Sequence, residues 1–307
     1  MPLYNKAAQV LDTVASVAAQ TVTNWELVVV DDGSTDGGPA LVRALGDARI
    51  RVVGQANAGV SAARNRGIEL ASAELIAFLD ADDLWLPEFL AIVLALQVDF
   101  PEALWFATGY EIRPVQGDAF ASRLRGPAIN FSRGVLPDYF SVAIVSDPPV
   151  WTSATAVQRD VIQAIGGFPV GIGSGEDLLT WAKLAVRCPL AYEAQPLVVF
   201  VVSGIERRPD AADRVGKALV QLLREYPAAP GLRGYLGLWY RMQAVMAMRF
   251  GDTALARQRA WLAVRYGPRQ LRNFYTLLLA LLPAAWHQAL DTQVRSLFGK
   301  KKGDATS

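Results

Sequence analysis

Strand patterns alternate with amphipathic helix patterns through the first two-thirds of this 307-residue chain. The clearest strand patterns are "LVVV" at residues 27–30 and "LIAFL" at residues 75–79, both apolar at successive positions rather than at every second one. Strands of this kind are typical of parallel sheets that helices cover on both faces, with right-handed crossovers between the strands. We therefore predict an α/β fold with a mostly parallel central sheet flanked by helices.

The pattern changes after about residue 205, where helices rich in Leu, Ala and Arg replace the alternation. We predict a first domain at residues 1–205, divided into halves at 1–100 and 101–205. A helical region follows at 206–299, and a basic, polar tail at 300–307 is expected to be disordered.

Composition limits the function further. The net charge of +1 gives no broad attraction to nucleic acid, so we expect no nucleic-acid partner. The single cysteine, Cys188, excludes a disulfide within the chain and suits a reducing compartment. The apolar stretch at residues 275–286 is too short to span a bilayer and contains Pro283.

Acidic residues gather where strands end or a helix begins. Ligands of open α/β sheets bind beyond the carboxyl ends of the strands, so these acids are candidate site residues. They are Asp31 and Asp32, then Asp80, Asp82 and Asp83, then Glu176 and Asp177.

The "DAD" of residues 80–82 suits a hard divalent cation. Mg²⁺ or Mn²⁺ commonly takes one or two protein carboxylates and completes its shell with water and phosphate oxygens. A diphosphate ester would be the matching ligand, because the metal neutralises charge on a departing phosphate. The same acids could instead cap the helix expected near Pro87.

The other candidates also allow two interpretations. Asp31 and Asp32 could accept hydrogen bonds from a nucleobase or ribose, or could stabilise the turn "GSTDGG" by hydrogen bonds to its backbone. Glu176 or Asp177 could be a general base for a sugar hydroxyl, or a partner of a helix dipole. Arg64 could bind a phosphate, or be a solvated helix cation. Residue types alone leave glycoside hydrolysis by paired carboxylates open.

In this order and spacing, the segments resemble family-2 glycosyltransferases of the GT-A fold. The matching segments are "PLYNK", "VVVDDGSTD", "NAGVSAARNRGIELA", "FLDADDLWLP" and "GGFPVGIGSGEDLLTWAKLA". The resemblance implies a Rossmann-like half that binds a nucleotide-sugar, then a half that binds the acceptor. It also implies inverting transfer of the sugar to a hydroxyl acceptor by a metal-assisted single displacement.

The resemblance assigns a role to each candidate. Those implied to bind the donor are Pro2, Tyr4, Asp31, Asp32, Arg64 and Asp80, with Asp32 at the base. Asp82 matches the metal-binding acid of the DxD motif, with Asp80 on ribose or metal. Asp177 matches the catalytic base, with Glu176 beside it. Trp151 and Thr152 match the acceptor wall. Arg207 and Arg208 are the candidates for holding the diphosphate, where family members often carry a basic or histidine-containing loop.

In this family an apolar strand, central to the sheet, precedes the turn that "PLYN" matches. That strand is missing before Met1, so we expect unpaired backbone groups and an apolar slot beside its neighbours. We favour a true start upstream over a truncated, damaged copy. The alternative function is a non-catalytic, glycosyltransferase-like protein that binds nucleotide or a partner without turnover.

The C-terminal segment "TLLLALLPAAWHQALDTQVRSLFGKKK" combines an apolar helix pattern with a basic end. This combination suits docking on an anionic membrane surface and equally suits packing on the rest of the chain. We therefore predict a cytoplasmic enzyme that could lie on the inner face of the cell membrane. A saccharide or lipid-linked saccharide is the expected acceptor.

Overall fold

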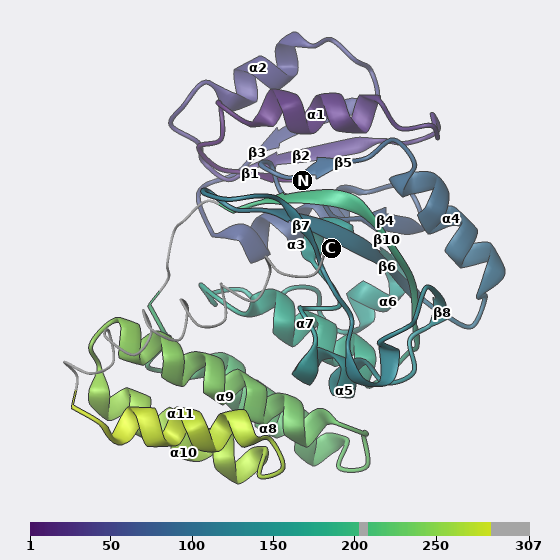
Figure 1. Ribbon diagram of the computed structural model, residues 1–307. Coiled ribbons are helices and arrows are strands. Elements are labelled where there is room, and N and C mark those ends of the chain that lie inside the picture. Colours follow the sequence, from purple (N-terminus) through teal and green to yellow (C-terminus); the bar gives the residue numbers. More distant parts are fainter. Residues whose placement is uncertain (203–207, 284–307) are drawn as a thin grey trace, which may run out of the picture. The chain divides into compact units, whose positions relative to one another are not determined.

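The computed structural model describes residues 1–202 and 208–283 (Figure 1). The chain divides into two compact units. The first contains Met1–Ile205 and Glu225–Pro230, and the second contains Glu206–Arg224 and Gly231–Ser307. The tail predicted at residues 300–307 lies outside the described residues.

The first unit begins with a parallel three-stranded sheet covered by helices. Its strands are β1 (Pro2–Leu3), β2 (Leu27–Asp31) and β3 (Ile50–Gly54), in that order. Its helices are α1 (Val10–Ala18), α2 (Gly38–Ala44) and α3 (Val60–Leu70). In Figure 1, α1 and α2 lie together on one side of this sheet. Helix α3 packs against β2, where Val30 and Ala63 are both buried.

A seven-stranded mixed sheet forms the rest of this unit, in the order β4-β9-β6-β10-β5 with β7 on β6 and β8 on β10. The long strands β6 and β10 are parallel, and the other pairs of this sheet are antiparallel. The strands are β4 (Leu75–Ala77), β5 (Leu84–Trp85), β6 (Trp105–Arg113), β7 (Phe120–Ala121), β8 (Arg133–Val135), β9 (Thr155–Gln158) and β10 (Leu190–Val201). The predicted α/β fold is confirmed.

Four α-helices and two 3₁₀ turns accompany the larger sheet. They are α4 (Phe89–Asp99), η1 (Gly126–Ala128), α5 (Tyr139–Val145), η2 (Thr152–Ala154), α6 (Arg159–Ala164) and α7 (Glu176–Ala185). Helix α4 packs on β6 and β10. Helix α7 contributes Trp181, which stacks at 6.1 Å between ring centroids on Trp105 of β6.

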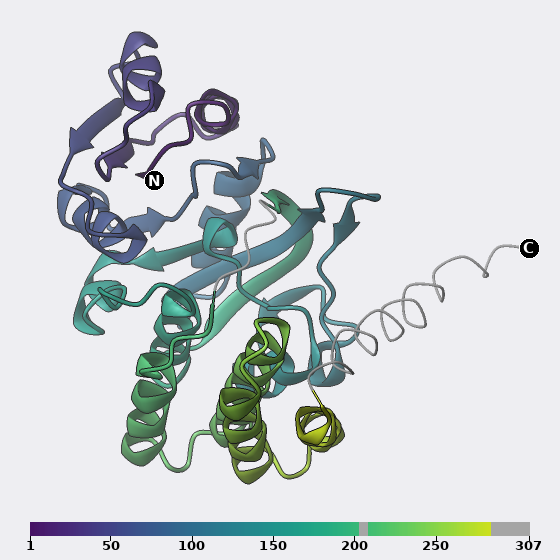
Figure 2. The same ribbon diagram turned by 90° about the vertical axis from the view of Figure 1, so that its left-hand side faces the viewer.

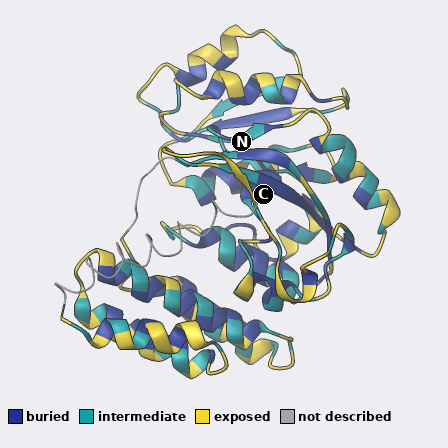
Figure 3. Ribbon diagram, viewed as in Figure 1, coloured by how far each residue is buried: buried dark blue, intermediate teal, exposed yellow. Residues whose placement is uncertain are grey.

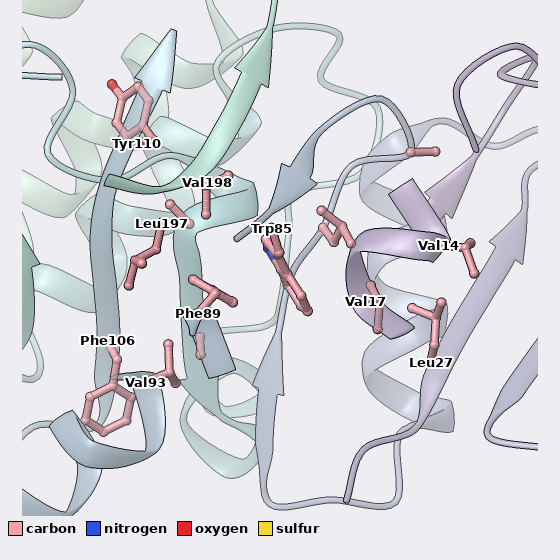
Figure 4. Packing of buried hydrophobic residues seen from close by; sticks show 14 of the residues in the cluster. Val14, Val17, Leu27, Trp85, Phe89, Val93, Phe106, Tyr110, Leu197 and Val198 are labelled. Carbon is pink, nitrogen blue, oxygen red and sulfur yellow. The ribbon is translucent and has the colours of Figure 1, made fainter. Parts of the chain in front are cut away.

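One hydrophobic core joins the two sheets of this unit (Figure 4). Val14 and Val17 of α1 share it with Trp85 of β5 and Phe106 of β6. Polar contacts reinforce the link, because the Gln20 side chain donates to Leu86 O at 2.8 Å. The core therefore holds the ends of β2 and of β4, where the candidate acids lie, in one unit.

An apolar cavity of about 230 Å³ separates β2 from β4. Its lining includes Leu27 and Val28 on one side and Leu75 and Ala77 on the other. Strand β1 pairs with β2 only at Val30 and Asp31, and β4 pairs with β9. The N-terminus lies between the two sheets (Figures 1 and 2), so the apolar slot expected from the sequence is present.

The second unit is helical. It contains α8 (Arg214–Glu225, whose last residue belongs to the first unit), α9 (Leu232–Arg249), α10 (Thr253–Tyr266) and α11 (Leu271–Leu281). Helix α9 meets the end of α10 so closely that a Cβ on Gly237 would lie 2.8 Å from Gly267 N. Across residues 1–202 and 208–283, no helix is both long and apolar enough to cross a membrane.

Candidate active site

The turn after β1 is held against the loop after β2. Asn5 adopts a left-handed conformation (φ 52°), and its side-chain oxygen accepts a hydrogen bond from Thr35 N at 2.8 Å. Asn5 N donates to Ser34 Oγ at 3.2 Å. Tyr4, next to Asn5, is about half exposed, while Pro2 lies in β1. Both predicted nucleotide-contact residues therefore lie at or beside the carboxyl end of β1.

Asp32 is buried and fixes the loop that enters α3. Its carboxylate accepts hydrogen bonds from Gln55 Nε2 at 2.8 Å, Ala58 N at 2.9 Å and Gly59 N at 2.8 Å. Because a carboxylate has about four acceptor positions, roughly one stays open for a ligand. Asp31, by contrast, accepts one local bond from Ser34 N at 2.9 Å. Contact of Asp32 with a base stays a prediction.

Arg64 of α3 joins two of the acidic clusters. Its Nη2 atom lies 2.7 and 3.0 Å from the two carboxylate oxygens of Asp80, and its Nη1 atom lies 3.3 Å from Glu176 Oε1. Burial lowers the pKa of the guanidinium, but the charge and hydrogen bond of Asp80 outweigh this effect and raise it. Arg64 is 6% exposed, so it is a buried ion-pair partner rather than a solvated helix cation.

Asp82 faces a cation of its own chain. The ammonium group of Lys6, which follows the "PLYN" turn, lies 2.5 Å from Asp82 Oδ2. Sequence reasoning missed Lys6, although its place in the matched "PLYNK" segment could have indicated it. The pairing shows that a positive charge can reach this carboxylate from the end of β1.

Asp83 is a second residue that sequence reasoning assigned no role. It is buried, and its Oδ2 atom accepts hydrogen bonds from Ser153 Oγ at 2.5 Å and Trp151 Nε1 at 3.0 Å. Its Oδ1 atom accepts from Val201 N at 3.2 Å, at the end of β10. Burial, followed by the negative charge of Asp80, raises the pKa of Asp83 to about 7.

The predicted acceptor residues Trp151 and Thr152 lie beside the loop that carries Asp82 and Asp83. Trp151 stacks on Phe200 with ring centroids 3.9 Å apart, and its indole N–H reaches Asp83. Thr152 is buried at the start of η2. Residues Thr152–Ala154 form a 3₁₀ turn, and strand β9 begins after it at Thr155.

Helix α7 begins with the third acidic cluster. Gly175 before it has a left-handed backbone (φ 82°), which glycine adopts without strain. Glu176 is buried beside Arg64, whereas Asp177 keeps partial exposure and accepts only a local bond from Leu178 N at 2.7 Å. Burial and the charge of Glu176 raise the pKa of Asp177 to about 6, against the opposing charge of Arg64.

Neither diphosphate candidate lies within the described part of the first unit. Arg207 is outside the described residues. Arg208 belongs to the second unit, where its guanidinium lies 5.3 Å from the ring centroid of Phe250. A role for either residue in holding a diphosphate stays a prediction.

The carboxylates of this loop suit a metal ion that is bound mainly through one of them. Both oxygens of Asp80 accept hydrogen bonds from Arg64, whereas Asp82 contacts the ammonium group of Lys6. Within residues 1–202 and 208–283, no three His, Cys, Asp or Glu residues gather as a complete metal site. Mg²⁺ and Mn²⁺ tolerate such a site when substrate phosphates supply the remaining ligands.

The family model described as "Glycosyl transferase family 2" matches residues 1–157, just over half of the chain. The chain belongs to glycosyltransferase family 2. The match contains the turn after β1, both strand-end acidic clusters and the Trp151 turn, and it ends before Glu176 and Asp177.

Two curated relatives each match part of this chain. An "Uncharacterized glycosyltransferase" of Rickettsia bellii is 32% identical over 191 residues, which is 61% of this chain and 26% of the relative. The chain therefore spans about a quarter of that protein's length. The Escherichia coli "UDP-Glc:alpha-D-GlcNAc-diphosphoundecaprenol beta-1,3-glucosyltransferase WfgD" is 37% identical over 99 residues, covering 32% of this chain and 39% of the relative.

A solved structure supports the fold. The crystal structure of S. aureus TarS 1-349 in complex with UDP-GlcNAc has a TM-score of 0.64 and 15% sequence identity, and the match covers 91% of this chain and 88% of TarS 1-349. At this identity the similarity concerns the fold, and it agrees with the predicted GT-A architecture with a helical C-terminal region.

Proposed function

We propose that this chain transfers a sugar from a nucleoside-diphosphate sugar to an acceptor hydroxyl with inversion at the anomeric carbon. The observation that carries the proposal is the convergence of Asp80 and Glu176 on Arg64. This contact brings the DxD loop, where the donor would bind, beside the start of α7, where a base would act. WfgD, by its name, uses UDP-glucose, and the TarS complex holds UDP-GlcNAc, which favours a UDP-sugar donor.

Residues at the ends of β1, β2 and β4 would bind the sugar donor. Pro2, Tyr4 and Asp32 would surround the nucleoside, and Asp80 would contact the ribose. Asp82 would hold Mg²⁺ or Mn²⁺, which when bound neutralises charge on the diphosphate. Because Lys6 Nζ lies 2.5 Å from Asp82 Oδ2, Lys6 would move aside or turn to a phosphate oxygen when the donor binds.

Transfer would then proceed in one displacement. Asp177 accepts the proton of the acceptor hydroxyl, while the hydroxyl oxygen forms a bond to the anomeric carbon. The bond from that carbon to the diphosphate breaks on the opposite face, and the nucleoside diphosphate leaves with the electron pair. A pKa of about 6 keeps Asp177 deprotonated near neutral pH, as a general base requires. The indole of Trp151 suits the wall that receives a saccharide acceptor, free or lipid-linked.

Two variants and one control test these assignments. Asp82→Ala is expected to lose metal-dependent stabilisation by UDP in thermal shift, measured with Mn²⁺, with Mg²⁺ and with EDTA. Asp177→Asn is expected to keep that stabilisation and lose transfer from UDP-sugars. Asp12→Asn, an exposed position on α1, serves as the control. Normal turnover by both site variants would overturn the assignments.

A further inference from the structure

Charge is divided unequally between the two units. Residues 206–224 and 231–307 carry 17 Lys/Arg against 6 Asp/Glu, a formal net charge of +11. The rest of the chain carries 13 Lys/Arg against 23 Asp/Glu, a net charge of −10. The whole-chain value of +1 therefore conceals two large and opposite charges.

The acids of the second unit already have partners within it. In the described part of this unit, 12 Lys/Arg accompany only Asp210, Asp213 and Asp252. Asp213 lies 2.7 Å from Arg259, and Asp210 lies 3.9 Å from Arg214. Asp252 accepts from Leu255 N at the start of α10. In the described part of this unit, the cations therefore outnumber the carboxylates by nine.

Helix α11 adds a row of exposed apolar side chains to this basic unit. The side chains recur every three or four residues, so they share one face of the helix. Their exposed fractions are 84% for Leu271, 42% for Phe274, 47% for Tyr275, 65% for Leu278 and 56% for Leu281. In Figure 3, exposed residues mark α11 along its length. We call these five residues the α11 row.

The other face of α11 is anchored, which fixes the direction of the row. Asn273 is buried and donates to Ala263 O at 2.8 Å and to Gly267 O at 3.0 Å. Ala280 is buried in the helical core, and its carbonyl accepts from Arg257 Nε at 3.1 Å. The α11 row therefore points away from the core of its own unit.

Basic side chains lie at both ends of the row. Arg269 and Arg272 are exposed and flank Leu271 at the start of α11. Arg257 is exposed and lies beside the carbonyl of Ala280 at the other end. An apolar helix face with cations around it is the arrangement that binds in the interface of an anionic bilayer.

We propose that the α11 row docks this protein on an anionic lipid bilayer. The apolar side chains enter the boundary between headgroups and acyl chains, and the surrounding arginines meet lipid phosphates. Charge argues against two copies meeting row to row, because two units of charge +11 would repel each other across that interface, whereas the same charge attracts an anionic surface. Vesicle binding needs no donor and no turnover, so it succeeds or fails separately from the transfer reaction.

Co-sedimentation of the full chain with vesicles tests the proposal. One set of vesicles is phosphatidylcholine alone, and the other contains about 30% phosphatidylglycerol to supply the negative surface potential. We expect binding to the anionic vesicles only, and weaker binding as salt rises from about 0.05 to about 0.5 M.

Two double variants separate the apolar and the charged contributions. Leu271→Ser with Leu278→Ser should weaken binding tenfold or more, because two exposed leucines no longer enter the bilayer. Arg269→Gln with Arg272→Gln should weaken it about fivefold for each arginine at low salt. The matched control is Leu94→Ser with Val98→Ser on α4, whose side chains are 40% and 77% exposed. It should bind like the wild type.

Three results would overturn the proposal. The first is equal binding to both kinds of vesicle, and the second is undiminished binding by the leucine variant. The third is a dimer in gel filtration that the leucine variant converts to a monomer, which would assign the row to contact between copies. Unchanged circular dichroism spectra of all variants would show that the losses do not come from unfolding.

Discussion

The hydroxyl of Ser153 lies between the two ends of the acidic loop: it donates to Asp83 Oδ2 at 2.5 Å and accepts from Asp80 N at 3.0 Å. The 3₁₀ turn Thr152–Ala154, which follows Trp151, thereby fixes the loop that carries Asp82. Ser153 and Asp83 are positioning residues in this interpretation, since neither is proposed to touch the substrate.

We expect Ser153→Ala to lower the free energy of unfolding by about 1–3 kcal/mol, because a buried carboxyl and a backbone N–H lose their shared partner. Urea unfolding measures the loss, and exposed Ser132→Ala is the control. Transfer should fall mainly in kcat, because a displaced loop misplaces the donor. A variant as stable and active as the wild type would exclude this positioning role.

Arg64→Gln should reduce stability by about 3 kcal/mol or more, because it leaves Asp80 and buried Glu176 without their counter-charge. Arg64→Lys should recover only part of this loss, since an ammonium group cannot span both carboxylates as a guanidinium does. Guanidinium unfolding of both variants provides the measurement. Arg66→Gln, at an exposed ion pair on the same helix, should change stability by less than about 0.5 kcal/mol.

The pH dependence of transfer should follow Asp177. Its pKa is raised from 3.8 to about 6 in the chain without substrate, so kcat/KM should decline as the pH falls through about 6. Stability should change in the opposite direction and rise as the pH falls from about 6 to about 4. The reason is that the Asp177 carboxyl binds its proton more strongly in the folded chain than in the unfolded chain. Asp177→Asn should therefore raise Tm relative to wild type above pH 6, with the difference vanishing near pH 4. A pH profile of kcat/KM and melting curves across this range check both signs.

Lys6→Met should tighten Mn²⁺ binding several-fold, because the metal would no longer compete with an ammonium group at Asp82. Free Mn²⁺ can be followed by electron paramagnetic resonance during titration. Asp82→Asn should abolish the binding in either background. Mn²⁺ binding that survives Asp82→Asn would show that Asp82 is not the metal ligand, and equal affinities with and without Lys6 would show that Lys6 does not compete for it.

Arg259→Met tests the buried pair of the second unit. It leaves Asp213 uncompensated, although Tyr240 still donates to it at 3.1 Å, and should cost about 3–5 kcal/mol. Adding Asp213→Asn should restore part of the loss, because no buried charge then remains. Differential scanning calorimetry of the single and double variants measures this coupling.

The sequence predicted the α/β fold because its strands are continuous apolar runs that end in acids at one edge. It also indicated Asp80 and Glu176, the two carboxylates that Arg64 contacts, since turn and helix-start chemistry is local in the chain. It did not predict the partners. Lys6 and Asp82 are 76 positions apart, and Arg64 and Glu176 are 112 apart, so only the fold brings them together. The whole-chain net charge of +1 hid the opposite charges of the two units, which appear once the charges on each side of residue 205 are counted separately.

The pocket between β2 and β4 also has a mechanical consequence. Its walls are mainly apolar and it is partly open to solvent, so water that enters it would find few hydrogen-bond partners. A small apolar molecule should displace such water, and xenon should therefore occupy the space between Val28 and Ala77 and stabilise the first unit against unfolding.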